Sequence, residues 1–246
     1  MVKRKMGEKL KMSHKNPVEV QESYYKLPYH WFPDERLIEF KRIEKRRIIF
    51  EMIDQYSNDS IQNFLDVGCG DGRWTSEINN YLKTNSIGID FSKRAIEFAK
   101  LISPDIEFKM HEGHDLPFPE NTFDLCTTIE VIEHVQDNFE IKFLKECSRV
   151  LKPNGLFIIT TPSENLRLTD HHYRHYTVNR LRELINANGF EILSIRGQSL
   201  PCYGYKRKIR KIMSRNSKIW KIWKYTHKEV DPENALNLFV AARPIK

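Results

Sequence analysis

Residues 64–72 read FLDVGCGDG, and this stretch decides the fold. A short apolar run ends at Asp66, and glycines follow at alternate positions, Gly68, Gly70 and Gly72. Because glycine has no Cβ, such a turn lets bare backbone approach a ligand at the start of the next helix. The stretch therefore predicts a strand, a ligand-binding turn and then a helix.

The spacing of the glycines distinguishes two kinds of nucleotide site. A dinucleotide fingerprint, G-x-G-x-x-G, requires a third glycine at position 73, where the chain has Arg73. A nicotinamide site is therefore disfavoured. The pattern that remains, D-x-G-x-G-x-G, resembles the first motif of class I S-adenosylmethionine-dependent methyltransferases. The resemblance implies that Asp66, Gly68 and Gly70 bind S-adenosylmethionine.

A second acidic residue follows at the end of the next predicted strand. NSIGIDFS, residues 85–92, runs into Asp90, 24 residues after Asp66, and Ser92 is placed to cap the helix that follows. A carboxylate at the tip of the second strand can accept hydrogen bonds from both ribose hydroxyls of an adenosyl group. Asp90 is the predicted ribose ligand.

The register of the same family implies further cofactor contacts. Phe91 falls beside the adenine ring, and Glu112 falls where the family usually has an Asp that accepts from the adenine amino group. Gly113 and Ile129 complete the implied cofactor-binding set. His111 and His114, which flank Glu112 and Gly113, are expected near the adenine and far from the transferred methyl group.

Strands and helices alternate through the rest of the chain, a pattern typical of a parallel sheet covered on both faces. Lys-Pro-Asn-Gly at 152–155 predicts a turn between a helix and the fifth strand. We expect an α/β fold, a Rossmann-like class I methyltransferase with a seven-stranded, mostly parallel sheet. In the family the last strand is antiparallel.

We expect one α/β domain preceded by an N-terminal extension. Residues 1–60 comprise a basic tail, an aromatic segment at 24–32 and a first helix. The aromatic segment is either a lid over the reaction or a clasp that anchors the helix. Residues 61–246 form the methyltransferase domain, with a basic amphipathic insertion at about 198–235.

Positive charge is concentrated outside the catalytic body. The chain carries a formal net charge of +7, while residues 1–16 hold six Lys or Arg against one acid and residues 205–228 hold ten against none. The second segment has apolar residues at helical spacing. It predicts a helix that contacts an anionic membrane or a phosphorylated substrate, one that binds nucleic acid, or one that packs on the domain.

The chain shows no secretory signal at its start and no run of 18 apolar residues. The four cysteines lack metal-like spacing and are expected to be reduced. We expect a cytoplasmic protein, with peripheral membrane attachment as an alternative. The sequence does not define an oligomeric state.

Candidates for chemistry fall in two places that the topology brings to the same sheet edge. Glu130, Glu133 and His134 follow the fourth strand, and a loop after the fifth strand carries His171, His172 and His175. Methyl transfer from a sulfonium is an in-line displacement, which needs alignment and removal of one proton. We expect Glu130, His134 and His172 to face the acceptor and act in catalysis.

The same residues allow a metal site. Glu130, Glu133 and His134, completed by His171 or His172, could bind Mg²⁺ or a similar ion. The arrangement resembles that of small-RNA 3′-terminal 2′-O-methyltransferases and of ubiquinone-pathway O-methyltransferases, but the motif also occurs in metal-free relatives. A metal and an unaided histidine base both remain open.

The residues around the loop indicate the class of acceptor. HYRHYT followed by LRELINANGF is similar to methyltransferases that act on sugars, lipid-like quinols and other small molecules. We expect O-methylation of a small or lipid-linked acceptor, such as a quinol precursor or a sugar. The alternatives are a metal-dependent RNA 2′-O-methyltransferase, with nucleic acid the less favoured partner, and a non-catalytic S-adenosylmethionine-binding regulator.

Overall fold

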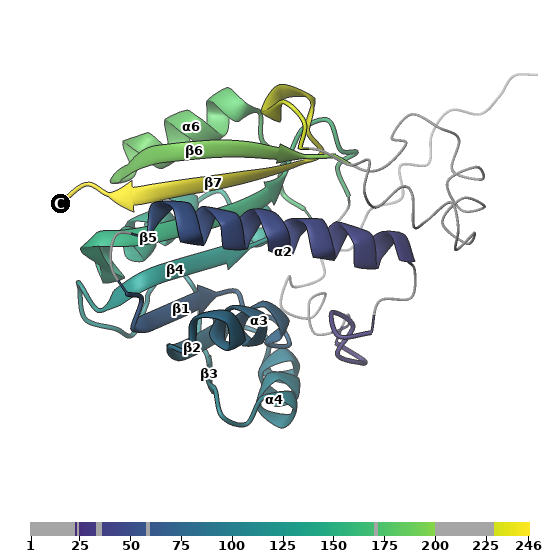
Figure 1. The fold of residues 1–246 in the computed structure, drawn as a ribbon, viewed down its shortest axis with the longest axis vertical. Coiled ribbons are helices and arrows are strands. Elements are labelled where there is room, and N and C mark those ends of the chain that lie inside the picture. The colour runs from purple at the N-terminus through teal and green to yellow at the C-terminus, as the bar shows by residue number, and fades with distance from the viewer. Residues whose placement is uncertain (1–22, 24, 33–35, 58–59, 170–171, 200–228) are drawn as a thin grey trace, which may run out of the picture.

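A computed structural model describes residues 23, 25–32, 36–57, 60–169, 172–199 and 229–246 of the chain (Figure 1). The predicted basic tail at 1–16 and the basic segment at 205–228 lie outside these residues. The strands are β1 (Asn63–Val67), β2 (Asn85–Asp90), β3 (Glu107–Met110), β4 (Phe123–Ile129), β5 (Leu151–Pro162), β6 (Phe190–Gln198) and β7 (Asn237–Pro244).

All seven strands belong to one sheet with the order β3-β2-β1-β4-β5-β7-β6. β1 pairs in parallel with β2 and β4, while β2 pairs with β3 and β4 with β5 in the same way. β7 lies between β5 and β6 and is antiparallel to both. The expected seven-stranded sheet with an antiparallel last strand is confirmed.

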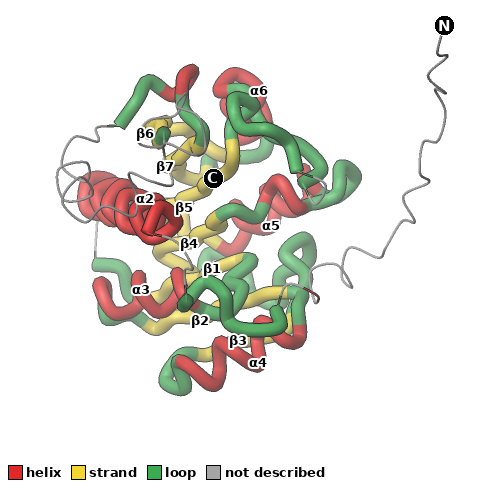
Figure 2. The backbone as a smooth tube through the Cα atoms, turned by 90° about the vertical axis from the view of Figure 1, so that its right-hand side faces the viewer, coloured by secondary structure: helices red, strands yellow, loops and turns green. Residues whose placement is uncertain are grey.

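Helices cover both faces of this sheet, as Figure 2 shows. α2 (Arg36–Tyr56) and α3 (Arg73–Leu82) lie on one side, and α5 (Glu140–Val150) and α6 (Val178–Ala187) lie on the other. α4 (Lys93–Ile102) packs along β2 and β3. Within the described part of the chain, the search for a membrane-spanning helix finds none with the required length and hydropathy.

Periodic apolar residues explain how the helices attach to the sheet. On α2, Ile49, Met52 and Ile53 recur at helical spacing and are fully buried against the side chains of the central strands. On the opposite face, α5 and α6 bury Leu144 and Leu181 in the second core cluster. The strand interiors are apolar because both faces are covered.

The helix start predicted at Ser92 is confirmed, and a second helix begins with the same kind of cap. Ser92 Oγ accepts a hydrogen bond of 3.1 Å from the backbone N–H of Ala95, at the start of α4. Thr177 Oγ1 accepts one of 3.0 Å from the N–H of Arg180, at the start of α6. Each satisfies a backbone donor that the first turn of a helix leaves unpaired.

One predicted turn has a different form. Lys-Pro-Asn-Gly does not separate helix from strand, because α5 ends at Val150 and β5 begins at Leu151. Leu151 pairs with Phe123 and Leu156 with Leu125, so residues 152–155 are an irregularity within β5. Burial of Leu151 explains the difference, since it draws the chain into the sheet directly after the helix.

Candidate active site

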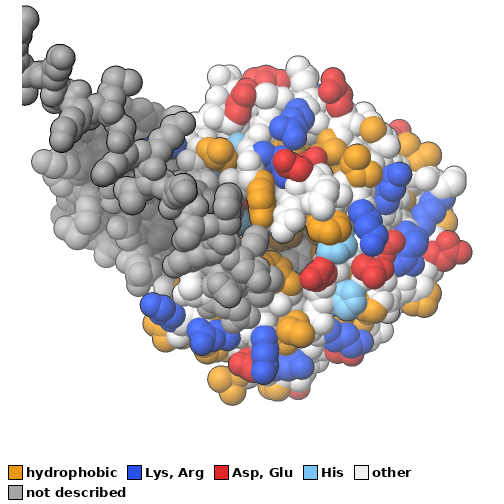
Figure 3. Space-filling view, turned by 180° about the vertical axis from the view of Figure 1, so that it is seen from behind, with side chains coloured by type: hydrophobic (Ala, Val, Ile, Leu, Met, Phe, Trp, Pro, Cys, Tyr) orange, Lys and Arg blue, Asp and Glu red, His pale blue; other side chains and the backbone are white. Residues whose placement is uncertain are grey.

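A cavity of about 820 Å³ opens at the carboxyl edge of the sheet. Its wall contains residues from the glycine turn after β1, from the ends of β2, β4 and β5, and from the segment after β3. Gln198 at the end of β6 and Asn237 at the start of β7 also line it. Figure 3 shows a face of the molecule on which histidine and acidic side chains lie beside a hollow. Open α/β sheets bind ligands at this edge.

The glycine turn has a backbone that other residues would adopt only with strain. Gly68 has φ +78°, and a Cβ placed there would lie 2.4 Å from Cγ2 of Val131. Gly70 has φ +55°, and its Cβ would lie 2.7 Å from the hydroxyl oxygen of Tyr25. The N–H groups of Gly68 and Cys69 donate to the carbonyl of Ile89 at 2.8 and 2.9 Å, which fixes the turn against β2. Bare backbone therefore faces the cavity, as the sequence predicts.

Asp90 lies beside the turn, at the end of β2. Its Oδ2 accepts from the N–H of Gly70 at 2.9 Å, and its Oδ1 accepts from the N–H of Ser92 at 2.8 Å. The residue is 5% exposed, and burial raises its pKa to about 6 despite these two hydrogen bonds. Because each carboxylate oxygen can accept a second hydrogen bond, both can still receive hydroxyl groups from a ligand.

Asp66 occupies a different position from the one that the resemblance implies. Its carboxylate is buried and accepts hydrogen bonds of 2.7 Å from the hydroxyls of Thr75 and Thr127. Burial raises its pKa to about 6. Asp66 is not among the residues that line the cavity. It links β1, β4 and α3 behind the glycine turn.

Four further residues implied for the cofactor all line the cavity: Phe91, Glu112, Gly113 and Ile129. Glu112 is largely exposed, and its Oε2 lies 3.1 Å from Nε2 of His114. The ring of His114 also stacks on Phe139, with centroids 4.1 Å apart. This part of the wall therefore offers rings and one carboxylate, which suits a flat heteroaromatic group.

The aromatic segment lies against the glycine turn. The backbone N–H of His30 donates to Oδ2 of Asp71 at 3.1 Å, and its ring Nδ1 lies 3.0 Å from Oδ1 of the same residue. The indole N–H of Trp31 donates to the carbonyl of Asp71 at 3.0 Å. Tyr25, only 2% exposed, and His30 also line the cavity. The segment thus anchors the glycine turn and also forms part of the cavity wall. The first property fits a clasp and the second fits a lid, the two alternatives that the sequence leaves open.

Glu130 is held by an ion pair that the sequence analysis did not identify. Its Oε1 lies 2.9 Å from Nζ of Lys45 on α2 and accepts from the hydroxyl of Thr160 at 2.9 Å, while Nδ2 of Asn237 donates to Oε2 at 3.0 Å. Glu130 has φ +58°, an uncommon conformation for a residue with a side chain. The structure maintains it at the end of β4, where it lines the cavity.

The sequence does indicate that Lys45 lies on the buried face of its helix. Ile49 and Met52 lie four and seven positions further along α2, so they share a helix face with Lys45. Lys45 is only 9% exposed because that face packs on the sheet. A lysine on an otherwise buried stripe requires an acidic partner. The identity of the partner, 85 positions away at Glu130, follows only from the tertiary structure.

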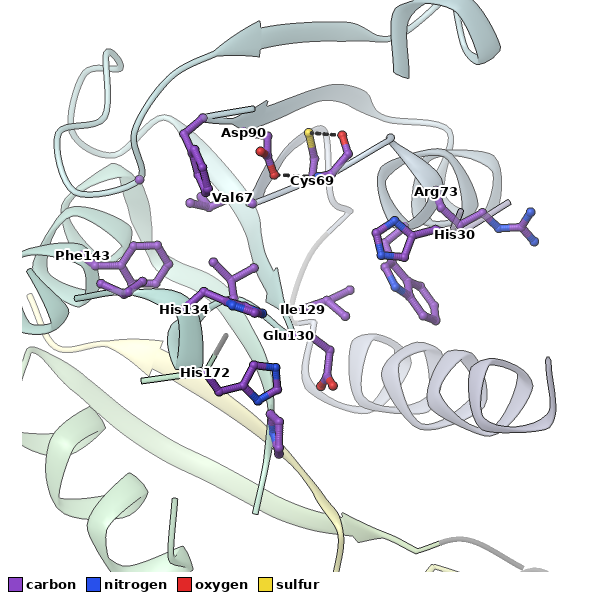
Figure 4. Close-up of a pocket in the computed structure, with 18 of the residues that line it drawn as sticks. His30, Val67, Cys69, Arg73, Asp90, Ile129, Glu130, His134, Phe143 and His172 are labelled. Carbon is purple, nitrogen blue, oxygen red and sulfur yellow. Dashed lines mark hydrogen bonds between the residues drawn. The ribbon is translucent and has the colours of Figure 1, made fainter. Parts of the chain in front are cut away.

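His134 and His172 lie across the cavity from Asp90 (Figure 4), and the buried Glu133 is next to them. Glu133 and His134 lie on a short 3-10 helix, η1 (Ile132–His134), directly after β4. His172 follows from the loop after β5, and its ring is perpendicular to that of His134, with centroids 4.6 Å apart. His134 and His172 line the cavity. His171 lies outside the described residues.

Glu133 has no contact with water. It is 0% exposed, its Oε2 accepts from the hydroxyl of Thr161 at 3.1 Å, and nothing among the described residues hydrogen-bonds to Oε1. Burial, reinforced by the nearby charge of Glu130, raises the pKa of Glu133 well above its usual value. Its neutral form is therefore favoured.

Glu133, His134 and His172 are also the possible ligands of a metal ion. Within the described residues, one ligand atom from each of Glu133, His134 and His172 lies within 4.8 Å of the other two. One carboxylate oxygen and two imidazole nitrogens suit zinc or iron, whereas Mg²⁺ favours oxygen ligands. Glu130 is occupied by Lys45 instead of completing the set. The residues present therefore do not fit Mg²⁺.

Comparison with known proteins agrees with this architecture. A family model described as "Methyltransferase domain" matches residues 65–159, which extend from β1 into β5. Over residues 65–159 the chain is therefore similar to methyltransferase domains. The matched residues include the glycine turn, Asp90 and Glu130, all of which contribute to the cavity wall.

Two curated relatives of this methyltransferase domain illustrate the similarity. A probable S-adenosylmethionine-dependent methyltransferase of Mycolicibacterium smegmatis is 28% identical over 138 residues, which cover 53% of this chain and 52% of the relative. A ubiquinone biosynthesis O-methyltransferase of Pelagibacter ubique is 34% identical over 148 residues, 57% of this chain and 58% of the relative. The chain thus spans little more than half the length of these relatives.

A solved structure shows the same fold. The methyltransferase domain superposes on an S-adenosylmethionine-dependent methyltransferase from Methanosarcina mazei with a TM-score of 0.59. The two are 20% identical, and the alignment covers 78% of this chain and 97% of the other. At this identity the likeness concerns the fold alone.

Proposed function

We propose that this protein transfers the methyl group of S-adenosylmethionine to a hydroxyl of a small or lipid-linked acceptor. One observation carries the proposal. A single cavity combines a bare glycine turn and the Asp90 carboxylate on one side with the imidazoles of His134 and His172 on the other. The first side can bind an adenosyl group, and an imidazole on the second side can accept the proton of the acceptor hydroxyl.

The cofactor occupies the side that contains Asp90. Asp90 accepts the ribose hydroxyls with the lone pairs that Gly70 and Ser92 leave available. Phe91 and Ile129 contact the adenine, and the exposed carboxylate of Glu112 accepts from its amino group. Gly68, Gly70 and Gly113 allow close approach of the backbone. Asp66 contributes indirectly, since its hydrogen bonds maintain the turn.

The reaction is an in-line displacement at the methyl carbon. An oxygen–carbon bond forms as the sulfur–carbon bond breaks, the electron pair remains on sulfur, and the acceptor hydroxyl gives up its proton. His134 and His172 are the imidazoles in the cavity wall opposite Asp90, so one of them accepts this proton. Glu130, fixed by Lys45 and Asn237, shapes the wall between cofactor and acceptor.

The acceptor class is supported by two observations. A relative that is 34% identical over its matched region is named a ubiquinone biosynthesis O-methyltransferase. The cavity of about 820 Å³ is large enough for the cofactor together with a small ring. We therefore propose a quinol precursor or a sugar as the acceptor.

We also propose a peripheral contact with anionic membranes through residues 205–228. In sequence, these positive charges lie between Gln198, at the end of β6, and Asn237, at the start of β7, and both of these residues line the cavity. Reversing the charges of Lys206, Arg207 and Lys208 should weaken binding to vesicles that contain phosphatidylglycerol, without changing cofactor affinity. Unaltered vesicle binding would contradict the membrane contact.

The experiment for the main proposal uses the full chain, labelled S-adenosylmethionine and an extract separated into lipid, glycan and RNA fractions. We expect label in the lipid or glycan fraction, and loss of labelling in a His134→Ala, His172→Ala double variant. Asp115→Asn, which changes an exposed carboxylate, is the control. Cofactor binding without label in any fraction would favour a non-catalytic regulator, and label in RNA would favour the ribose methyltransferase alternative.

A metal is the second candidate feature, because Oε1 of Glu133 accepts no hydrogen bond from the described residues and lies near two imidazoles. We propose that the enzyme works without Mg²⁺. Dialysis against EDTA should therefore leave the labelling rate unchanged. A loss that Zn²⁺ or Mn²⁺ restores would instead identify Glu133, His134 and His172 as ligands of a borderline metal.

A further inference from the structure

A third histidine lies directly behind His172. Nε2 of His175 is 2.7 Å from Nδ1 of His172, and Nδ1 of His175 is 2.8 Å from the carbonyl oxygen of Leu166. The ring centroids of the two histidines are 5.0 Å apart. His172 lines the cavity, whereas His175 is not among the lining residues. Any effect of His175 on the reaction is therefore indirect, through the ring of His172 or through Leu166, which also lines the cavity.

The chain of contacts fixes the positions of the ring protons. A carbonyl oxygen only accepts, so Nδ1 of His175 carries the proton that it donates to Leu166. In neutral His175 the other nitrogen, Nε2, then has a lone pair and accepts. Nδ1 of His172 must donate to it, which leaves the lone pair of neutral His172 on Nε2.

We propose that His175 is a positioning residue that holds His172 in its Nδ1–H tautomer, with Nε2 as the nitrogen that accepts the acceptor's proton. The proposal rests on the methyl transfer proposed above and adds which imidazole acts and through which atom. In the opposite tautomer, Nε2 carries a proton and cannot accept another. A population of that tautomer would be inactive, so fixing the ring raises the fraction of competent enzyme.

The surrounding loop is anchored firmly enough for such positioning. The backbone N–H of Tyr173 donates to the carbonyl of Glu133 at 2.9 Å. Arg174, nearly fully buried, donates from Nη1 to the carbonyl of Ile132 at 3.3 Å and to Oε1 of Glu140 at 3.2 Å. These bonds tie the loop after β5 to the turn after β4. They fix His172 relative to His134, which lies on that turn.

Two substitutions at position 175 separate positioning from packing. In His175→Gln, the amide oxygen can accept from Nδ1–H of His172 while the amide N–H donates to Leu166, so both hydrogen bonds can be kept. In His175→Leu, neither can form, although a side chain of moderate size still fills the space. Leu168→Ala, which changes an exposed side chain of the same loop, is the matched control.

Long-range ¹H–¹⁵N correlation spectra of the ¹⁵N-histidine-labelled full chain report the tautomer directly and need no acceptor. We expect His172 as Nδ1–H in the wild type, in Leu168→Ala and in His175→Gln, and mainly as Nε2–H in His175→Leu. An Nε2–H signal for His172 in the wild type would overturn the proposal. The proposal would also be overturned if His172 kept the same tautomer in His175→Leu as in the wild type. A spectrum that shows His175 doubly protonated at neutral pH would overturn it as well.

Labelled methyl transfer provides the second readout. His175→Leu should lower kcat about 10- to 100-fold with little change in the KM for S-adenosylmethionine, since a positioned base contributes about 100-fold or more. His175→Gln should restore most of the rate. If the leucine variant is unfolded by circular dichroism, failure of the folded glutamine variant to keep the Nδ1–H tautomer still overturns the proposal. Absence of methyl transfer in the wild type, with the predicted tautomer present, would contradict the proposed function instead.

Discussion

Cofactor affinity should rise as pH increases through the titration of Asp90. Burial raises the pKa of Asp90 to about 6 in the free protein. The ribose hydroxyls donate, so they favour the ionised carboxylate, and the bound state therefore holds the proton less tightly than the free state. By linkage, binding releases a proton below pH 6 and is weaker there.

The expected magnitude follows from this pKa. If only the ionised form accepts the ribose, the protein is almost fully competent at pH 7 and about one-tenth competent at pH 5. The dissociation constant should thus be about 10-fold larger at pH 5, equivalent to about 1.4 kcal/mol. Ionisation of S-adenosylhomocysteine contributes little, because its carboxyl, amino and adenine groups do not titrate between pH 5 and pH 7.

Isothermal titration calorimetry in two buffers of different ionisation enthalpy measures both the affinity and the protons released. The Asp90→Asn variant should bind about 30-fold or more weakly at pH 7, because a charge-assisted hydrogen bond is lost. It should also lose the release of the proton between pH 5 and 7. His30, His111, His114, His134 and His172 line the cavity as well, and any contribution from their titration would persist in this variant.

The reasoning would be refuted by an affinity of the wild type that is the same at pH 5 and pH 7. It would also be refuted if Asp90→Asn showed the full pH dependence of the wild type. Asp66→Asn is the matched control, because burial raises the pKa of Asp66 to about 6 as well, yet this residue does not line the cavity. Binding of S-adenosylhomocysteine by Asp66→Asn should keep the wild-type pH dependence.

Three further outcomes can be checked by chemical denaturation. Asp66→Asn should increase the free energy of unfolding by up to about 3 kcal/mol at pH 7, and by less at pH 4. Because the pKa of Asp66 is raised in the folded state, the wild type loses stability as pH rises from about 4 to about 6. A neutral amide avoids this loss. No gain at pH 7 would contradict this reading of the buried charge. Gly68→Ala should lower stability by about 2–4 kcal/mol, since φ +78° strains alanine and its Cβ meets Val131; a loss below about 0.5 kcal/mol would show that the turn adapts. Lys45→Met should lower it by about 1–3 kcal/mol by leaving Glu130 without its cation, whereas a neutral effect would mean that the ion pair is replaceable by apolar packing.

Much of this fold could be predicted because its signals are local. An apolar strand followed by alternate glycines specifies a turn through backbone sterics alone, and Ser92 or Thr177 marks a helix start through one side-chain hydrogen bond. The position of Asp90 could also be predicted, because the carboxyl ends of parallel strands face the ligand-binding edge of the sheet. In the structure the glycine turn and Asp90 both line the cavity.

The remaining features depend on contacts that local patterns do not encode. Sequence spacing brings Glu130 and Glu133 close together, but it does not show that Glu130 pairs with Lys45 or that Glu133 is fully buried. The resemblance implies that Asp66 binds the cofactor, whereas the structure directs its carboxylate to Thr75 and Thr127. Such orientations are set by packing between elements that the chain order separates.

A crystal structure of the full chain with S-adenosylhomocysteine would test the central claim most directly. The account predicts an adenosyl group in the cavity, with both ribose hydroxyls donating to the carboxylate of Asp90 and the sulfur facing His172. A cavity that stays empty at saturating ligand, or a ribose held by residues other than Asp90, would contradict it.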